Sequence, residues 1–445
     1  MNMWIVTTGN SDIILKHDKN WGNLYSEVRY DLECTEFASP IQKDPYNKEA
    51  GYTVPPRILG LVYGNQSDEY KSDLEFPLLD TYYQHFLDKK TKPERIVILL
   101  TDQAEIFDED QRLYEKCPFW QDTCTLTPLL EWYFKYKFDS HPEFLYLTPK
   151  TTDRGIDNWN QTLVLVQEKF RTLDCNFLKT VYVSHQAGTP AISSAVQFMS
   201  LARFGKQVKF LVSNEYEPRE PIFIDSPIYL KGLQLQEAKA LLERFDYSGV
   251  KRLLKQLWEG EVNSQEQKIK DLLDMAILWN CADFKKFAQA REKLAKERLD
   301  EWWWVGYEAA YLGMVRLEQG NTVEALFHSF RAVEGLIRDR NRSSKESLHQ
   351  LISKLPDWQK NVDFKIFNET TRKERNSLFH NILGLEEIEV FKRWETNNKK
   401  AWEARVLNCL NYITGQKFTS LEKATLMYDV HKELKNLISN YELKI

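Results

Sequence analysis

The chain carries one short stretch whose residue types could cleave a phosphodiester bond. Residues 371–381, "TRKERNSLFHN", place Arg375 five residues before His380, with Asn376 next to the arginine. A histidine that titrates near neutral pH can move the proton of an RNA 2′-hydroxyl or of a leaving group. An arginine can hold the phosphate and neutralise the charge that develops on it, and the asparagine can orient either group. The alternative is a solvated basic helix face with an incidental histidine.

The geometry of this stretch depends on the helix that carries it. In one regular helix over residues 365–383, Arg372, Asn376 and His380 share a face, because they are spaced by four. Arg375 would lie about 140° around that helix from His380 and would need a bent side chain or a distorted helix. Arg372 is therefore an auxiliary candidate. No cluster of carboxylates and histidines accompanies the stretch, so we expect chemistry without a metal.

A second group of candidates follows the first expected strand. Residues 6–12, "VTTGNSD", lead from an apolar run into Thr8, Gly9, Asn10 and Ser11. Small hydroxyl side chains and free backbone N–H groups in such a turn suit a phosphate or a ribose. The turn lacks the G-x-G-x-x-G pattern of a dinucleotide site and the pattern of a P-loop. A plain strand-to-loop turn is the alternative.

A third group lies in residues 184–195, "SHQAGTPAISSA". Gly188 permits an unusual turn, Thr189 can cap the next helix, and Pro190 fits the first turn of that helix. The start of a helix attracts anions, so Gln186 and Thr189 could read a base or a ribose. A capped helix needs no ligand, however. Three residues near the same expected rim are auxiliary candidates: Asp102, Gln103 and His185.

These loops require a parallel sheet to bring them together. Six short apolar runs predict buried strands at 3–8, 57–64, 95–101, 144–148, 180–185 and 207–213. Helix-length patterns separate them at 76–88, 126–138, 158–173 and 190–204. Strands that alternate with helices indicate an α/β domain with a parallel-rich sheet covered on both faces, and ligands of such sheets bind at the carboxyl ends of the strands.

The second half is predicted to be all-α. Thirteen of the 15 prolines precede residue 227, and proline interrupts helices. Apolar residues recur at three- and four-residue intervals over 235–245, 249–259, 267–280, 300–320, 322–340 and 421–443.

Composition limits the partners and the compartment. The first 226 residues hold 24 Lys and Arg against 33 Asp and Glu, a net of −9, and the remainder holds 36 against 32, a net of +4. Any contact with nucleic acid must therefore be local. The six cysteines lack metal or disulfide spacing, and we see no signal peptide or apolar run long enough to span a membrane. These features predict a cytoplasmic protein without a metal cofactor.

Taken together, "VTTGNSD", "HQAGTPA" and "RNSLFH", in this order, resemble the CARF–HEPN ribonucleases of type III CRISPR systems. The resemblance covers nearly the whole chain. It implies a Rossmann-like CARF sensor at 1–226, a helical connecting region at 227–298 and a HEPN ribonuclease bundle at 299–445. It also implies a homodimer whose sensor binds a cyclic oligoadenylate as allosteric activator, with tetra-adenylate favoured over hexa-adenylate.

By the same resemblance, the matching residues take family roles. Arg375, Asn376 and His380 would form a composite, metal-independent site that cleaves single-stranded RNA in antiviral defence. The activator would bind Thr8, Gly9, Asn10, Ser11, Gln186, Gly188, Thr189 and Pro190. The sensor could in addition degrade its own activator. Neither loop motif contains a lysine or arginine, although the expected ligand is a ring of phosphates.

Two other classes of function remain open at this point. The first is a ligand-responsive regulator that binds nucleic acid without cutting it, which would retain DNA and release no RNA products. The second is a HEPN toxin neutralised by a partner, which would leave the large α/β half unexplained. Cleavage of labelled RNA, with and without a cyclic oligoadenylate, separates the three.

Overall fold

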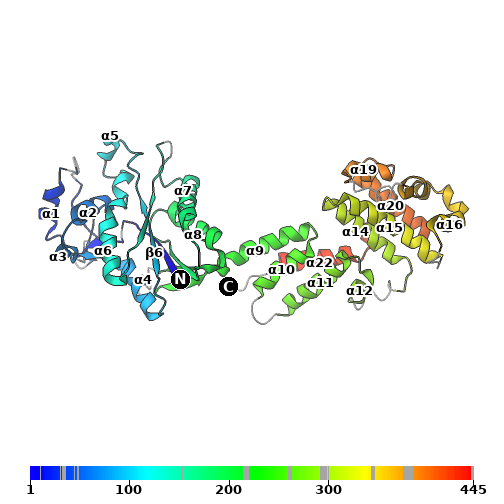
Figure 1. Ribbon diagram of the computed structural model, residues 1–445, viewed down its shortest axis with the longest axis horizontal. Helices are drawn as coiled ribbons and strands as arrows, with labels where there is room; N and C mark the ends of the chain where they lie inside the picture. Colours follow the sequence, from blue (N-terminus) through cyan, green and yellow to red (C-terminus); the bar gives the residue numbers. More distant parts are fainter. Residues whose placement is uncertain are drawn as a thin grey trace. The chain divides into compact units, whose positions relative to one another are not determined.

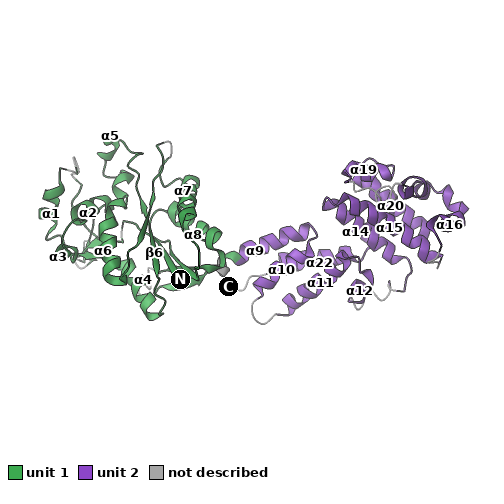
Figure 2. Cartoon of the chain, viewed as in Figure 1, with its two compact units in different colours: residues 1–230 green, residues 231–445 purple. Residues whose placement is uncertain are grey.

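The computed structural model describes residues 1–10, 12–30, 32, 37–44, 46–47, 50–151, 154–213, 220–258, 263–290, 298, 300–341, 346–373 and 384–441, without the side chains of 226–229. The chain forms two compact units, residues 1–230 and residues 231–445 (Figure 2). The predicted fold class, an α/β half followed by an all-α half, is confirmed. The expected domain boundaries at residues 226 and 298 stay predictions.

The first unit is built on a six-stranded sheet in the order β10-β9-β8-β1-β6-β7. Its strands are β1 (Asn2–Thr7), β6 (Arg95–Thr101), β7 (Glu143–Leu147), β8 (Thr180–Ser184), β9 (Val208–Val212) and β10 (Ile222–Asp225). All neighbours are parallel except β9 and β10. The central strand β1 pairs Val6 with Ile98 of β6 on one side and with Ser184 of β8 on the other.

Alternation along the strands divides the core into two layers. Trp4 and Val6 of β1 face one cluster, whereas Met3 and Ile5 face the other, because successive side chains of a strand point to opposite faces. The first cluster includes residues of α4 (Pro77–Asp88) and α6 (Thr127–Phe138), and the second includes residues of α7 (Trp159–Thr172) and α8 (Pro190–Phe204). Figure 1 shows these helix pairs on the two sides of the sheet.

One predicted strand is wrong. Residues 57–64 were expected to be a strand, but residues 57–63 belong to helix α2 (Pro56–Tyr63), which begins with Pro56 in its first turn, and Gly64 is its C-cap. Seven of its eight residues are buried, including Arg57, so the helix has no exposed polar face. A short apolar run of this kind does not distinguish a buried strand from a buried helix.

The helix α2 belongs to a longer insertion between β1 and α4. The insertion also contains α1 (Trp21–Val28), α3 (Asp68–Lys71) and a small antiparallel sheet in the order β3-β4-β2-β5. These four strands are β2 (Ile14–Leu15), β3 (Ile41–Gln42), β4 (Tyr52–Thr53) and β5 (Leu74–Glu75).

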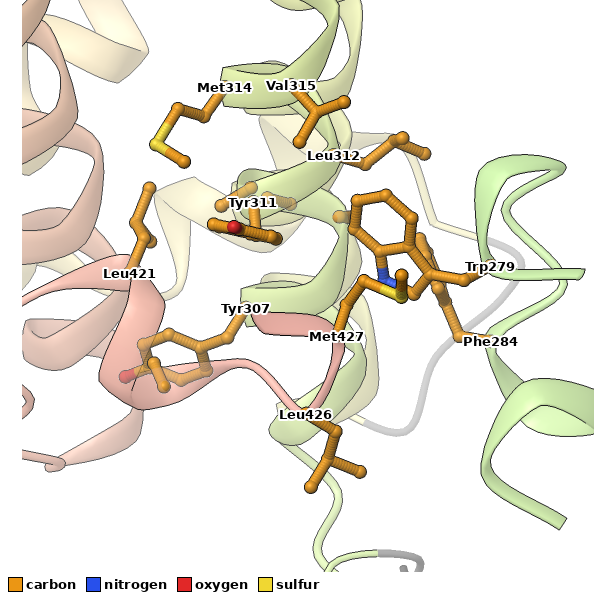
Figure 3. Packing of buried hydrophobic residues seen from close by; sticks show 14 of the residues in the cluster. Trp279, Phe284, Tyr307, Tyr311, Leu312, Met314, Val315, Leu421, Leu426 and Met427 are labelled. Carbon is orange, nitrogen blue, oxygen red and sulfur yellow. The ribbon is translucent and has the colours of Figure 1, made fainter. Parts of the chain in front are cut away.

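The described part of the second unit is helical. Its elements are α9 (Ser226–Glu243), α10 (Tyr247–Leu257), α11 (Ser264–Asn280), α12 (Phe284–Gln289), α14 (Trp304–Glu318), α15 (Thr322–Arg340), α16 (Leu348–Ser353), α17 (Val362–Ile366), α19 (Glu387–Arg393), α20 (Lys399–Thr414), α21 (Leu421–Ala424) and α22 (Met427–Ser439). One hydrophobic cluster connects residues from Leu235 to Ile438. Figure 3 shows part of it, where Trp279 and Phe284 lie near Tyr311, Leu312 and Met427.

A second correction concerns the last predicted helix. In place of one helix over residues 421–443, the described residues form two helices, α21 and α22, because the chain is extended at Thr425. The break places the Thr425 hydroxyl and the Leu426 N–H against the fully buried carboxylate of Glu308, which also accepts the indole N–H of Trp279 at 2.8 Å. Burial raises the pKa of Glu308, while these donors oppose the rise. A buried carboxyl thus receives the donors it needs from the helix break.

The helix considered above for residues 365–383 is not a regular α-helix in the part that the structure describes. The helix α17 ends at Ile366, a π-helical segment covers Phe367–Thr371, and Arg372 and Lys373 continue as α-helix. Residues 374–383 lie outside the described residues. The predicted common face of Arg372, Asn376 and His380 therefore stays a prediction.

Candidate functional site

A cavity of about 460 Å³ lies at the carboxyl ends of the parallel strands of the first unit. The loops after β1, β6, β7 and β8 and the segment before α6 contribute its lining residues: Thr8, Gly9, Asn10, Thr101, Gln103, Lys116, Pro118, Gln121, Thr123, Ile156, Asp157, Gln186, Ala187, Gly188, Thr189 and Ile192. The chain continues from β1 to β6 on one side and returns to β8 on the other. Ligands of open α/β sheets bind at such a change of strand order.

The two predicted loops meet directly in this cavity. A Cβ atom added to Gly9 would lie only 2.8 Å from the backbone nitrogen of Gly188, so the loops after β1 and β8 are in close backbone contact. Gly188 has φ +95°, a conformation that favours glycine. The amide N–H of Gly9 donates to the Asp12 carboxylate at 2.7 Å, which fixes the turn after β1. The structure therefore brings together Gly9 and Gly188 as the sequence predicted.

Thr189 caps α8, which begins at Pro190. Its hydroxyl accepts the N–H of Ile192 at 3.3 Å and donates to the carbonyl oxygen of Ile156 at 3.4 Å. Pro190 is in the first turn but does not line the cavity, whereas Ile192 does. The start of α8 is thereby joined to the loop after β7.

Gln186 lines the cavity, but the fold already occupies its side-chain amide. Its Oε1 accepts the Tyr82 hydroxyl at 3.1 Å and the Ser213 N–H at 2.5 Å, and its Nε2 donates to the Ser213 carbonyl oxygen at 2.8 Å. His185 is not among the lining residues. Its Nδ1 lies 2.9 Å from the Ser193 hydroxyl, and burial lowers its pKa.

Hydrogen bonds of polar side chains connect residues that line the cavity. The buried carboxylate of Asp122 accepts the backbone N–H of Gln103 at 2.8 Å and its Nε2 at 3.1 Å, while the Gln103 Oε1 accepts the Ile156 N–H at 3.0 Å. Asp102 does not line the cavity. It pairs with Arg57 of α2 at 2.8 Å, and the same guanidinium nitrogen lies 2.8 Å from Asp122.

Three residues of interest were missed in the sequence. Lys116 lines the cavity and supplies the cation that both loop motifs lack, and Gln121 lines it from the same connection between β6 and α6. No spacing signal marks this connection as part of the site. Asp12 was visible within "VTTGNSD", but its burial was not; burial raises the pKa of its carboxyl to about 7, and the Gly9 N–H opposes the rise. Ser11 lies outside the described residues.

The second predicted site cannot be built from the described residues. Arg375, Asn376 and His380 lie outside them. Just before them, the Arg372 Nε donates to the carbonyl oxygen of Asn368 at 3.3 Å, and the buried Thr371 donates to the carbonyl oxygen of Arg393 at 2.8 Å. Thr371 therefore anchors the start of the stretch against the end of α19.

The helical unit contains a cavity of about 510 Å³ between α12, α14 and α15. Its charged lining residues are balanced, with Lys285, Arg331 and Arg338 against Asp283, Glu334 and Asp339. His328 also lines it, and burial together with Arg331 and Arg316 lowers its pKa to about 4. This balance favours neither an anionic nor a cationic ligand.

Two features are not found in the described part of the chain. It contains no group of three or more His, Cys, Asp or Glu side chains placed to hold a metal ion. None of its helices is long and apolar enough to cross a membrane.

Comparison with known proteins gives a match at the level of structure. No family model and no curated protein matches the sequence. Among solved structures, the chain is similar to Enterococcus italicus Csm6 bound to cyclic hexa-2'-fluoro-hexa-dAMP, with 11% sequence identity and a TM-score of 0.51. The match covers 98% of this chain and 100% of that chain. At this identity the likeness shows a common fold.

Proposed function

We propose that the protein is an endoribonuclease activated by a cyclic oligoadenylate, a CARF–HEPN protein of type III CRISPR defence. The observation that carries the proposal is the cavity at the change of strand order, in a chain with the fold of a Csm6 that was itself bound to a cyclic hexanucleotide analogue. Backbone groups of the Gly9 and Gly188 loops, the Thr189 cap and Lys116 line that cavity and suit phosphates and riboses.

The proposed cleavage uses the motif in residues 371–381. His380 moves the proton of the 2′-hydroxyl or of the leaving group, Arg375 holds the phosphate, and Asn376 orients them. The 2′-oxygen attacks the adjacent phosphorus, the 5′-oxygen leaves with a proton, and a 2′,3′-cyclic phosphate remains. These groups require no metal ion. We propose a homodimer in which two such motifs complete one site.

Regulation follows from differential binding. The activator shifts the equilibrium toward the cleaving state only if it binds that state more tightly than the resting one. The sensor half carries a net charge of −9, so activator phosphates depend on local donors and on Lys116. The proposed activator is cyclic tetra-adenylate in preference to hexa-adenylate, and an additional ring-cleaving activity of the sensor is tested in the same reactions.

The test is cleavage of labelled single-stranded RNA in a metal chelator. Three reactions contain cyclic tetra-adenylate, cyclic hexa-adenylate or no activator, and a DNA oligonucleotide serves as a parallel substrate. We expect RNA products that depend on an activator and end in a cyclic phosphate. Retention of DNA without RNA products would instead favour a ligand-responsive regulator, and activator-independent cleavage blocked by a partner would favour a toxin.

His380→Ala should lower the cleavage rate by about 10²- to 10⁴-fold, the usual contribution of a general acid–base group, and leave activator binding intact. His349→Ala, at an exposed position of α16 in the same unit, is the matched control. Near-wild-type cleavage by the His380 variant would contradict the assignment.

Substitution of Thr189 or Ser11 should raise the activator concentration required for half-maximal cleavage.

A further inference from the structure

The cavity contains four side-chain amides, and the fold occupies two of them. Gln186 is hydrogen-bonded to Ser213 and Tyr82, and Gln103 is hydrogen-bonded to Asp122 and Ile156. Gln103 is buried, so breaking its hydrogen bonds would leave buried polar groups unpaired, which costs more than a typical new hydrogen bond contributes. Gln186 is exposed, but both ends of its amide are already hydrogen-bonded to neighbouring residues. Either glutamine would have to give up bonds that the fold already makes in order to read a base. The amides of Asn10 and Gln121 are the remaining ones in the cavity lining.

Gln121 is presented by a rigid turn. It is the exposed last residue of a 3₁₀ turn, Pro118–Gln121, whose neighbours Phe119, Trp120 and Asp122 are all buried. The Trp120 indole N–H donates to the carbonyl oxygen of Arg112 at 2.8 Å. In the described part of the chain, no hydrogen bond of the Gln121 amide is found, so both ends of this amide are free to meet a ligand.

Arg57 of α2 holds the turn Pro118–Gln121 in place. Its Nε donates to the carbonyl oxygen of Phe119 at 2.7 Å, and its guanidinium carbon lies 3.9 Å from the centre of the Phe119 ring. Its Nη2 donates to Asp102 and Asp122, each at 2.8 Å. One guanidinium thus ties the turn that carries Gln121 to the end of β6. Lysine cannot reproduce this fork, because an ammonium group is a point charge without planar geometry.

We infer that Gln121 is the side chain that reads the base of the ligand and that Arg57 is its positioning residue. A primary amide matches the major-groove edge of adenine with one donor and one acceptor, because the exocyclic N6 amine donates and the ring nitrogen N7 accepts. Inosine presents two acceptors on that edge, its keto oxygen O6 and N7, so the amide oxygen finds no donor there. The inference rests on the proposed function, since it presumes that the ligand is a cyclic oligoadenylate.

The experiment compares the binding of cyclic tetra-adenylate with that of cyclic tetra-inosinate to the full-length chain, by isothermal titration calorimetry. The hexamers of both bases are measured in parallel, so that ring size does not decide the outcome. Wild type should prefer the adenine ring by roughly 5- to 150-fold, the range for one bidentate base contact. Gln121→Ala should reduce this preference to less than threefold. Gln66→Ala, which removes a half-buried amide of the insertion that donates to Glu27, should keep it.

Arg57→Lys tests the positioning role. It should weaken binding of the adenine ring and reduce the preference, and it should change little further when combined with Gln121→Ala. The matched control is Arg95→Lys, which alters an arginine–glutamate pair at the amino end of β6 and β7. A loss of thermal stability without loss of preference is expected for Arg95→Lys, and that result for Arg57→Lys would overturn its positioning role.

The possible results distinguish a failure of the proposed function from a failure of the base-reading inference. If wild type binds neither ring, the proposed function fails. If wild type prefers adenine and Gln121→Ala keeps the preference, the base-reading inference fails while the proposed function stands. Loss of the preference in Asn10→Ala rather than in Gln121→Ala would assign base reading to the loop after β1 and would likewise overturn the inference.

Discussion

Lys116 supplies a positive charge to a cavity whose loops after β1 and β8 have none in their sequence motifs. It lines the cavity from the connection between β6 and α6 and is exposed. An ammonium group that contacts a phosphate makes binding depend on salt, because dissolved ions screen the attraction between the two charges. We therefore propose that Lys116 contacts a phosphate of the ligand.

Lys116→Ala should weaken activator binding roughly 10-fold, as expected for the loss of one hydrogen bond to a charged group. The dependence of log affinity on log salt concentration should also become weaker, because one contact between opposite charges is lost. Titrations at several salt concentrations measure both. Lys92→Ala is the control, because Lys92 is an exposed lysine that precedes the amino end of β6. An unchanged salt slope would show that Lys116 does not contact a phosphate.

Asp12 makes the stability of the first unit depend on pH. Burial raises the pKa of its carboxyl from 3.8 to about 7, so the folded chain holds a proton that the unfolded chain has lost in this range. A raised pKa in the folded state contributes stability that is fully present below about pH 4 and is lost as the pH rises through 7.

Asp12→Asn removes the buried charge and can still accept the Gly9 N–H. At pH 8 we expect the variant to be more stable than wild type by up to about 4 kcal/mol, since each pKa unit corresponds to about 1.4 kcal/mol. At pH 4 the two should unfold alike. Urea unfolding at both values checks this, with the exposed Asp18→Asn as control. A gain of equal size at both values would contradict the assignment.

The sequence predicted which loops form the candidate site, but not which of their side chains remain available to bind a ligand. Gly9, Gly188 and Thr189 lie together. The sequence predicted them because small residues at strand ends carry a local signal. Gln186 is predicted from the sequence to read a base or a ribose, yet its amide is hydrogen-bonded to Ser213, 27 residues further along the chain. Such a pairing depends on how β8 and β9 lie side by side, which local spacing does not contain. Arg375 and His380 stay a prediction.

At the scale of elements, the loops after β1 and β8 pack closely against each other. Gly9→Ala would place a Cβ atom 2.8 Å from the Gly188 backbone nitrogen, closer than such atoms approach, so the loops would have to separate. Overpacking of this kind costs about 1–3 kcal/mol.

We therefore expect Gly9→Ala to lower activator affinity by roughly 5- to 150-fold, which corresponds to that cost. Calorimetric titration measures the affinity. Gly22→Ala is the matched control, because a Cβ atom at Gly22 in α1 would meet nothing within 4 Å. Equal affinities for both variants would show that the loop contact is not required for binding.

Five of the six predicted strands are observed, as β1, β6, β7, β8 and β9, whereas the stretch 57–64 and the residues around Thr425 were assigned wrongly. The helices α7 and α8 match their expected ranges closely, because each begins at a capping side chain. The stretch 57–64 was misassigned because α2 is buried on nearly all sides. The break at Thr425 was missed because its cause, the buried Glu308, lies 117 residues away in the sequence.

At the scale of the whole molecule, the two units hold separate cores. The clusters of the first unit end by Leu211 and that of the second begins at Leu235, among the described residues. Each core is large enough for cooperative unfolding, so the chain should not melt as a single two-state system.

Differential scanning calorimetry of the full chain should therefore show two transitions. A cyclic oligoadenylate at 100 times its dissociation constant should stabilise the unit that binds it by about 2.7 kcal/mol and leave the other transition in place. Cyclic tetra-inosinate at the same concentration is the control ligand. A single transition that shifts as a whole would show that the units unfold together.

The position of α22 has a consequence for how the chain is made. The hydroxyl of Tyr247 lies 3.1 Å from His431, Lys268 pairs with Glu433, and Lys435 pairs with Glu243, so the last helix packs on elements made roughly 165–190 residues earlier. Its buried residues, up to Ile438, belong to the core of the helical unit. On the ribosome that core stays open until this helix emerges, whereas the six-stranded sheet of the first unit can close much earlier. The nascent chain thus acquires the fold of the first unit before the helical unit is assembled.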